Sequence, residues 1–241
     1  MKDKTIIECD ERFVNTLKYI QSRAGGTLGK GKLTIKNTCV EVLRDAIAEI
    51  IINDCKSHYI LENMKLPIHD NFDRHLFITA LCEFDREMDK YLVMEILEIS
   101  PVFVLSSFYD FKLSNLKKRW DEICLIANDN VENLVVEGNF FELLKYLISN
   151  LEQRLDEVFL ECIQDEVRLY DRQMKELSIS YINQSLPSSM RAVSILIHNN
   201  PRKIFFWGGQ SEFFDRIKSL FGGCVELPEA KELFNIHSAQ V

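Results

Sequence analysis

The sequence predicts an α+β fold, predominantly helical, with a mixed sheet formed by N-terminal and C-terminal strands around a helical middle region. Short segments with alternating apolar residues, which are typical of strands, occur near both ends of the chain. Apolar residues at helical spacing fill the middle. Because strands need partners, the simplest architecture joins both ends in one sheet, and two separate modules are the alternative.

Residues 1–37 are expected to form a small βαβ element. Alternating residues mark strands at Thr5–Cys9 and Lys32–Lys36, with an amphipathic helix between them. Asp10 is a suitable N-cap for this helix. Gly25–Gly26 is expected to end it, because glycine accepts the left-handed backbone conformation that follows many helices.

Residues 38–155 form the predicted helical region. Thr38 and Glu41 make a capping box at the start of its first helix. Asp70 is the expected cap of a second, longer helix, which proline halts at Ser100–Pro101. Two further helices follow. The apolar residues that define the four helical faces are, in chain order, Val40, Leu43, Ile47 and Ile51; Phe77, Leu81, Phe84, Met88, Tyr91 and Ile96; Leu113, Leu116, Trp120, Ile123 and Ala127; and Phe140, Leu144, Leu147 and Leu151.

Residues 156–241 form the predicted C-terminal α/β region, which is expected to share a sheet with residues 1–37. A helical region interrupted at Pro187 precedes its third strand. Ser211 is the expected cap of a further helix, and Pro228 is a suitable first residue for a terminal one. The predicted strands of this region are Glu157–Ile163 and Glu166–Tyr170, paired as an antiparallel hairpin, then Lys203–Trp207 and Cys224–Leu227.

The composition is that of a globular protein with an acidic surface. Hydrophobic residues make up 46% and charged residues 27%, so disorder is not expected. The net charge of −8 opposes the counterion release that drives nucleic-acid binding, so we expect no nucleic-acid partner. Arg172–Leu220 holds seven basic and three acidic residues. A binder of an anionic surface is therefore a further hypothesis, beside a solvated mosaic of charges.

Cysteine usage and the N-terminus indicate where the protein acts. Seven cysteines without a C-x-x-C pair are typical of buried, reduced thiols rather than of disulfides or a zinc site. The first residues include Lys2 and Lys4 and lack the apolar region of a signal peptide. Apolar runs such as Val102–Leu105 fall far short of the roughly 18 residues of a spanning helix. We expect a cytoplasmic protein without a membrane span.

The glycine-rich loop Gly25–Lys32 is the most specific local motif, because it contains the Gly-x4-Gly-Lys spacing of a phosphate-binding loop. Two features argue against phosphate binding. Leu33 occupies the position of the Mg²⁺-binding hydroxyl, and the loop runs from a helix into a strand, the reverse of the usual geometry. We prefer a flexible basic turn. A nucleotide- or phosphate-binding protein or enzyme that uses this loop is the alternative.

We assign no catalytic, cofactor-binding or metal-ligating residues and no cofactor. His69 and His75 are the one local histidine pair, at a spacing that does not share a helical face. Cys224 is expected to begin a strand, whereas the N-terminus of a helix is what lowers a thiol pKa. No Gly-x-Ser-x-Gly motif occurs in the sequence.

The strand Lys203–Trp207 places cationic side chains, including Arg202, beside three aromatic ones. Alternation sends Phe205 and Trp207 to one face of the sheet and Phe206 to the other. A binding surface and a sheet covered on both faces both explain this run. We favour core packing, because strands of a covered sheet have continuous apolar sequences.

The segment from Ser107 to Leu227 carries hydrophobic motifs in a definite order. They are Phe108–Leu113 before a helix with Trp120, then Phe140–Leu147, Asp156–Leu160, Val167–Asp171 and Ile195–Ile204, ahead of Phe221–Gly222 and Val225. In this order the segment resembles the YtxC-like sporulation protein family. The resemblance implies a role in endospore formation in a Gram-positive, spore-forming bacterium. It carries over no biochemical activity and no catalytic residues.

The resemblance and the lack of a catalytic constellation lead to one leading hypothesis. The chain is expected to be a sporulation-associated, non-enzymatic, cytoplasmic accessory protein that works by binding another protein.

Overall fold

The computed structural model describes seven stretches of the chain. They are residues 4–36, 40–65, 68–136, 140–163, 166–179, 186–208 and 211–227. None of the helices within these stretches is long and apolar enough to cross a membrane. Two predicted features fall on residues outside these stretches: the capping box at Thr38 and the terminal helix from Pro228.

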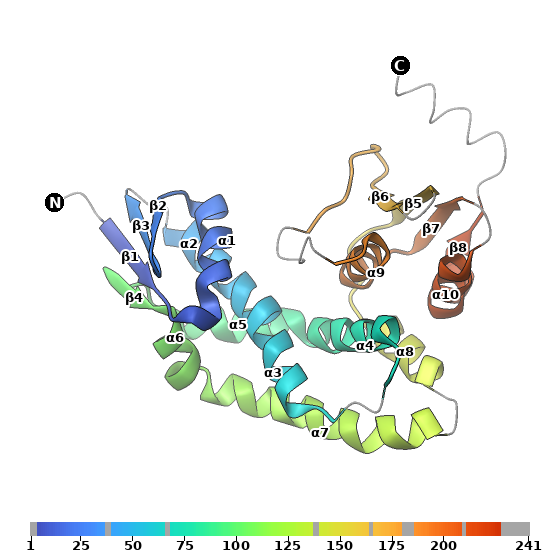
Figure 1. Cartoon of the computed structure of the whole chain (residues 1–241), viewed down its shortest axis with the longest axis horizontal. Coiled ribbons are helices and arrows are strands. Elements are labelled where there is room, and N and C mark those ends of the chain that lie inside the picture. Colours follow the sequence, from blue (N-terminus) through green and yellow to red (C-terminus); the bar gives the residue numbers. More distant parts are fainter. Residues whose placement is uncertain are drawn as a thin grey trace. The chain divides into compact units, whose positions relative to one another are not determined.

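The α+β, predominantly helical class is confirmed, but the single shared sheet is wrong. The described strands form two separate four-stranded mixed sheets, in the orders β2-β3-β1-β4 (sheet A) and β6-β5-β7-β8 (sheet B). Sheet A lies in the blue and green part of the chain and sheet B in the yellow to red part (Figure 1). The N-terminal strands pair with one another and with β4, and the C-terminal strands pair among themselves.

The chain divides into two compact units, each made of two segments. Unit 1 consists of Met1–Leu66 and Asp85–Asn130, and unit 2 of Pro67–Phe84 and Val131–Val241. The division of the chain into residues 1–37, 38–155 and 156–241 as domains stays a prediction.

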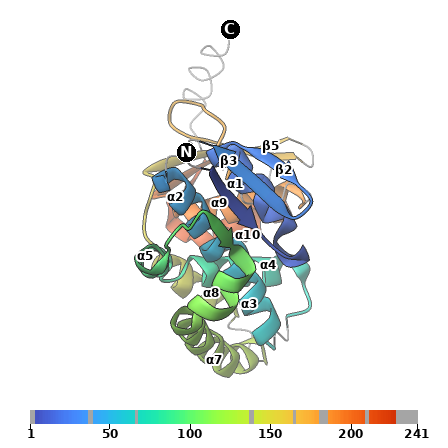
Figure 2. The same ribbon diagram turned by 90° about the vertical axis from the view of Figure 1, so that its left-hand side faces the viewer.

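Unit 1 consists of sheet A and the helices that pack with it. Its elements are β1 (Lys4–Glu8), α1 (Val14–Ala24), β2 (Thr27–Gly29), β3 (Lys32–Lys36), α2 (Val40–Ile50), α3 (Lys56–Asn63), α5 (Arg86–Ile96), β4 (Val102–Val104), α6 (Leu105–Ser107) and most of α7 (Ser114–Val136), with a 3-10 turn at Glu11–Phe13 and π-helical turns at Ile51–Cys55 and Phe108–Lys112. β1 pairs with β3 antiparallel and with β4 in parallel. The helices α1 and α2 pack side by side (Figures 1 and 2).

The core of unit 1 lies between one face of sheet A and these helices. Ile7, Leu33 and Phe103 point from three neighbouring strands into this core and are buried. Leu17 of α1 and Trp120 of α7 are fully buried in the same cluster. The predicted apolar faces of these two helices are therefore confirmed, whereas Val40 at the start of α2 is exposed.

The predicted long helix after Asp70 is two helices, so its continuity is wrong. The cap is confirmed, because Asp70 accepts hydrogen bonds from the backbone N–H groups of Phe72 and Asp73. The helix α4 (Asn71–Glu83) ends where Phe84 takes an extended conformation and Asp85 a left-handed one, with φ +55°. Aspartate tolerates this conformation better than most residues. The chain thereby leaves unit 2 and enters unit 1.

Unit 2 builds a layer of helices on one face of sheet B. Its elements are α4, α8 (Phe140–Ser149), β5 (Glu157–Ile163), β6 (Glu166–Tyr170), α9 (Ser188–Asn199), β7 (Lys203–Trp207), α10 (Glu212–Phe221), a 3-10 turn at Gly222–Cys224 and β8 (Val225–Glu226). The hairpin β5–β6 is confirmed, and β7 adds to β5 in parallel. The side chain of Ser211 caps α10 by accepting from the N–H of Phe214 at 3.2 Å, as predicted.

Candidate functional site

The glycine-rich loop folds as a β-hairpin. The strands β2 and β3 pair antiparallel, with Gly29 opposite Lys32, and Gly31 adopts a positive φ in the turn. The ammonium group of Lys32 lies 2.7 Å from the carboxylate of Glu8 on the neighbouring strand. A phosphate-binding loop leads into a helix whose N-terminal N–H groups face the phosphate, and here a strand follows instead. The geometry of this hairpin does not match that motif.

The histidines and cysteines do not converge on a metal site within the described stretches. His69 is exposed, and the imidazole of His75 lies 2.7 Å from the hydroxyl of Ser194. No three His, Cys, Asp or Glu side chains in these stretches are arranged to hold a metal ion. Cys55 and Cys124 are buried, and burial raises the pKa of the Cys124 thiol to about 11.

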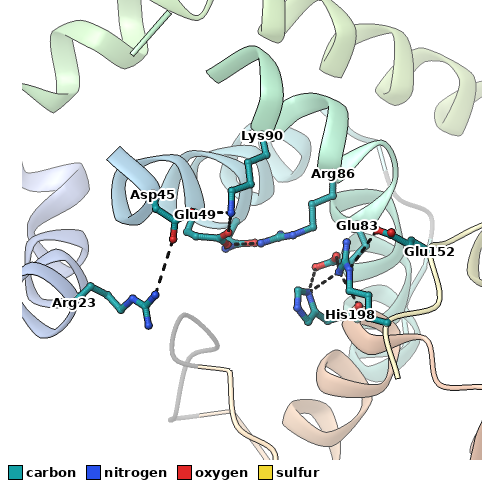
Figure 3. Close-up of polar contacts among 10 residues, drawn as sticks. Arg23, Asp45, Glu49, Glu83, Arg86, Lys90, Glu152 and His198 are labelled. Carbon is teal, nitrogen blue, oxygen red and sulfur yellow. Dashed lines mark hydrogen bonds and ion pairs between the residues drawn. The ribbon is translucent and has the colours of Figure 1, made fainter. Parts of the chain in front are cut away.

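A polar cluster in unit 1 joins three helices (Figure 3). Lys90 of α5 lies 2.8 Å from Asp45 and 2.7 Å from Glu49, both on α2. Arg86, one turn before Lys90, lies 2.5 Å from Glu49, and Arg23 of α1 lies 3.9 Å from Asp45. Each carboxylate of the cluster thus faces a cation. This matching of charges fastens α1, α2 and α5 together and provides no unpaired base for catalysis.

A second ion pair of unit 1 is fully buried. The ammonium of Lys56 lies 2.7 Å from a carboxylate oxygen of Asp89, and both side chains have an exposed fraction of 0%. The indole N–H of Trp120 donates to the same oxygen at 3.0 Å. These contacts join α3, α5 and α7 inside the core. A buried pair without solvent access has a structural role.

One carboxyl of unit 1 has an unusual pKa. Asp54 lies in the π-helical turn that continues α2, and burial raises its pKa to about 6, although His58 acts in the opposite direction. Such turns and such shifts both occur at functional sites. His58 is exposed and the two side chains share no hydrogen bond within the described residues. This single carboxyl is not a site by itself.

A polar cluster in unit 2 fastens the segment before β5 to the end of α9. A guanidinium nitrogen of Arg154 lies 3.0 Å from Glu83 of α4 and donates to the backbone carbonyl of His198 at 2.7 Å. The Nδ1 atom of His198 lies 3.0 Å from the other carboxylate oxygen of Glu83, and Arg154 also lies 3.7 Å from Glu152 (Figure 3). Arg154 already forms an ion pair with the Glu83 carboxylate, so the role of this cluster is structural. We call its residues Glu83, Glu152, Arg154 and His198 the clasp.

A cavity of about 90 Å³ in unit 2 lies elsewhere, against α9. Its lining residues are Val167, Arg168, Leu169, Glu176, Leu177, Ser178, Ile179, Arg191, Ala192 and Ile195, and they include none of the clasp residues. Ligand pockets usually measure about 300–1,000 Å³. The cavity therefore has room for a few water molecules but not for a substrate of ordinary size.

The two faces of sheet B differ sharply. On one face the side chains are buried, because α9 and α10 lie on this side of the sheet (Figure 1). Phe206 of β7 has an exposed fraction of 1%, and its ring centroid lies 4.6 Å from that of Phe214 on α10. The other members of this buried face are Val158, Leu160, Leu169 and Ile204.

The opposite face of sheet B carries four aromatic side chains, Phe159, Tyr170, Phe205 and Trp207, which we call the aromatic face. The register places Phe159 between Tyr170 and Phe205 on its two neighbouring strands. The rings of Phe159 and Phe205 are stacked with centroids 5.0 Å apart, and the Trp207 ring lies 5.3 Å from Phe159. All four side chains keep part of their surface exposed.

Charged side chains form a rim around the aromatic face, and most of them pair with one another. Lys203 lies 3.0 Å from Glu226, and Arg168 lies 2.7 Å from Glu166. Arg172 lies 3.7 Å from Glu157. An aromatic centre with a charged rim is the usual anatomy of a protein-binding surface.

The predicted alternation of Phe205, Phe206 and Trp207 is confirmed, and core packing is confirmed for Phe206. For Phe205 and Trp207, which are partly buried, cover of their face by a second layer stays a prediction. Phe206 is buried in the core, whereas Phe205 and Trp207 remain half-buried on the other face. The apolar run arises because one face is covered by helices and the other by the stacking of aromatic rings on each other.

Comparison with protein families gives a match over most of the chain. The model of the YtxC-like family matches residues 41–226. The chain belongs to the YtxC-like family. Within this YtxC-like chain the matched range contains all four strands of sheet B and the complete aromatic face, whereas β1, β2 and β3 lie before it. No curated protein and no solved structure matches the chain.

Sequence reasoning missed part of the aromatic face of this YtxC-like protein. Phe159 and Tyr170 were not connected to Phe205, because their neighbourhood depends on the parallel pairing of β5 with β7. One feature of the sequence could have indicated this face, namely the alternation of side chains along the predicted strands. In the predicted strands, Phe159, Phe205 and Trp207 share their strand faces with the glutamates and lysine at positions 157, 161 and 203, which is unusual for a covered face.

Proposed function

We propose that this YtxC-like chain is a non-enzymatic, cytoplasmic accessory protein of endospore formation that binds another protein through its aromatic face. The resemblance to sporulation proteins supports the process. The aromatic face supports the mode of action, and it is the single observation on which the proposal depends. Partly exposed aromatic rings gathered on one face of a sheet form an apolar patch, and such patches often mark interaction surfaces.

The charges in and around the aromatic face favour a protein as its partner over a nucleic acid. On and around the aromatic face the side chains of Glu157, Glu161, Glu166 and Glu226 outnumber the cations Arg168, Arg172 and Lys203. A nucleic-acid surface needs an excess of cations to replace the counterions of the phosphates. A partner protein needs an apolar area opposite the rings and polar groups opposite the rim.

Trp207 is the expected anchor of this interface. Tryptophan is among the residues whose truncation costs most at protein interfaces, commonly 2 kcal/mol or more, which corresponds to about thirtyfold in affinity. A Trp207→Ala variant should therefore lose the interaction while keeping the buried face of sheet B intact.

One experiment, in a spore-forming bacterium that carries the gene, tests both the role in endospore formation and the use of the aromatic face. Deletion of the gene should lower the count of heat-resistant spores, and the wild-type gene should restore it. Genes with Trp207→Ala or Phe205→Ala should fail to restore it. The matched control is Phe111→Ala, which truncates a 78%-exposed aromatic residue of unit 1 and should restore the count fully. Immunoblots and thermal unfolding of the purified variants verify equal protein levels and intact folding.

An unchanged spore count after deletion would remove the proposed process. If the deletion lowers the count but both aromatic-face variants restore it, the process stands and the aromatic face is not the surface used.

A further inference from the structure

We infer that the partner of the aromatic face inserts a cationic side chain, an arginine or lysine, against Glu161. The inference rests on the proposed protein-binding function and adds the chemical identity of the anchoring group. It arises from the position of one carboxylate among three aromatic rings.

Glu161 lies among the aromatic side chains and not at the rim. It follows Phe159 by two residues on β5, so both side chains are on the same face. The register pairs Glu161 with Trp207 on the neighbouring strand β7. On the other side, the hydroxyl of Tyr170 donates to a carboxylate oxygen of Glu161 at 3.2 Å.

Glu161 forms no ion pair with a cation in the described part of the chain. Its neighbour across β6 is Arg168, whose guanidinium lies 2.7 Å from Glu166 and also forms a hydrogen bond with the hydroxyl of Tyr170. The nearest cation on β7 is Lys203, which lies 3.0 Å from Glu226. The rim carboxylates Glu157, Glu166 and Glu226 thus have cationic partners within the described residues, while Glu161 accepts from the phenol hydroxyl of Tyr170.

A cation is the ligand that fits this arrangement. A partly buried carboxylate attracts a positive group more strongly than an exposed one, because less water screens the interaction. The faces of Phe159, Tyr170 and Trp207 carry the negative part of the ring quadrupole and attract a cation placed over them. A carboxylate and several rings therefore act on the same bound group. Arginine is expected to bind more tightly than lysine, because its planar guanidinium stacks on rings and bonds a carboxylate with two N–H groups.

The surroundings of Tyr170 also keep its hydroxyl protonated, so that it can donate a hydrogen bond. Burial, together with the neighbouring negative charge of Glu161, raises the pKa of Tyr170. The phenol therefore holds its proton and orients the carboxylate. Because the hydroxyl occupies one of the two carboxylate oxygens, the other oxygen remains for an incoming N–H donor.

The test titrates the full chain with N-acetyl-arginine amide and follows the two indole N–H signals by NMR. The signal of Trp207 should shift in a saturable way. The signal of Trp120, which lies in the buried core and bonds to Asp89, should not move and serves as the internal reference. N-acetyl-lysine amide should bind more weakly, and the neutral isostere N-acetyl-citrulline amide should leave both signals unchanged.

The decisive variant is Glu161→Gln, which keeps the acceptor for Tyr170 and removes the charge. Affinity for the arginine probe should fall about fivefold or more, in line with the loss of a partly screened ion pair. The matched control is Glu157→Gln, a rim carboxylate of the same hairpin that pairs with Arg172 and not with the cross-strand neighbour of Glu161, and it should bind the probe as the wild type does. Equal binding of arginine and citrulline probes, or no effect of Glu161→Gln, would overturn the inference.

Spore counts separate this inference from the proposed function. A Glu161→Gln gene should fail to restore heat-resistant spores in the deletion strain. If it restores them while Trp207→Ala does not, the aromatic face is used but its anchor is not a cation at Glu161. If both restore them, the aromatic face is not the surface used, and the inference falls with that part of the proposed function.

Discussion

Replacement of Asp89 by asparagine is expected to destabilise unit 1 by about 3–5 kcal/mol. The Asp89→Asn change removes the negative charge 2.7 Å from the ammonium of Lys56, and neither side chain has access to solvent. Removing one member of a buried ion pair leaves the other charge in a medium that solvates it poorly. Urea unfolding followed by the fluorescence of Trp120, whose indole donates to Asp89, measures the loss.

The matched control is the double variant Lys56→Met with Asp89→Asn. It removes both charges and keeps similar volumes, so it should recover most of the lost stability, because replacing a whole buried pair is often neutral or better. If the single Asp89→Asn variant unfolds at the same urea concentration as the wild type, the assignment of this pair as buried and structural is contradicted.

Phe206→Ala is expected to cost about 3–5 kcal/mol of the unfolding free energy of unit 2, whereas Phe205→Ala should cost about 1 kcal/mol or less. The two residues are adjacent and identical, and they differ in the face of sheet B to which they point. Phe206 fills the space beside Phe214 and would leave a cavity. Phe205 loses its stacking on Phe159 and a half-buried surface.

This comparison is internally controlled, since strand propensity and position in the sheet are the same for both variants. The measurement is the pair of unfolding free energies from urea titrations of the full chain. Equal losses for Phe205→Ala and Phe206→Ala would mean that sheet B is covered on both faces, and the docking surface proposed for the aromatic face would be wrong.

Helix caps and single strands could be predicted from the sequence, because residues close to them in the chain determine them. The cap at Asp70, the cap at Ser211 and the strand Lys203–Trp207 follow from side chains within one turn or from simple alternation. The break at Phe84–Asp85 was not visible, because the apolar spacing continues across it as Met88, Tyr91 and Ile96. In the structure these three residues are exposed.

The arrangement of strands depends on long-range pairing that composition does not reveal. The short strands β2 and β4 were missed, since three residues carry too little pattern to be recognised. Without β2 and β4 the N-terminal part of the chain had only two predicted strands, and the single shared sheet was the simplest solution. Pairing of β2 with β3 and of β1 with the distant β4 completes sheet A without the C-terminal strands.

The aromatic face shows the same limit at the level of the site. Phe205 and Trp207 were correctly assigned to one face, but the rings that surround them come from strands more than 30 residues away in sequence. The location of Glu161 among these rings requires the pairing of β5 with both β6 and β7. No spacing within one segment predicts such a cluster.

Radical footprinting of the full chain in solution tests most directly whether the aromatic face is open to a partner. Oxidation of Phe159, Tyr170, Phe205 and Trp207 should proceed several times faster than oxidation of Phe206 and Phe214, which are buried between sheet B and α10. Equal protection of both sets would show that this face is already covered within the chain, and would contradict the account.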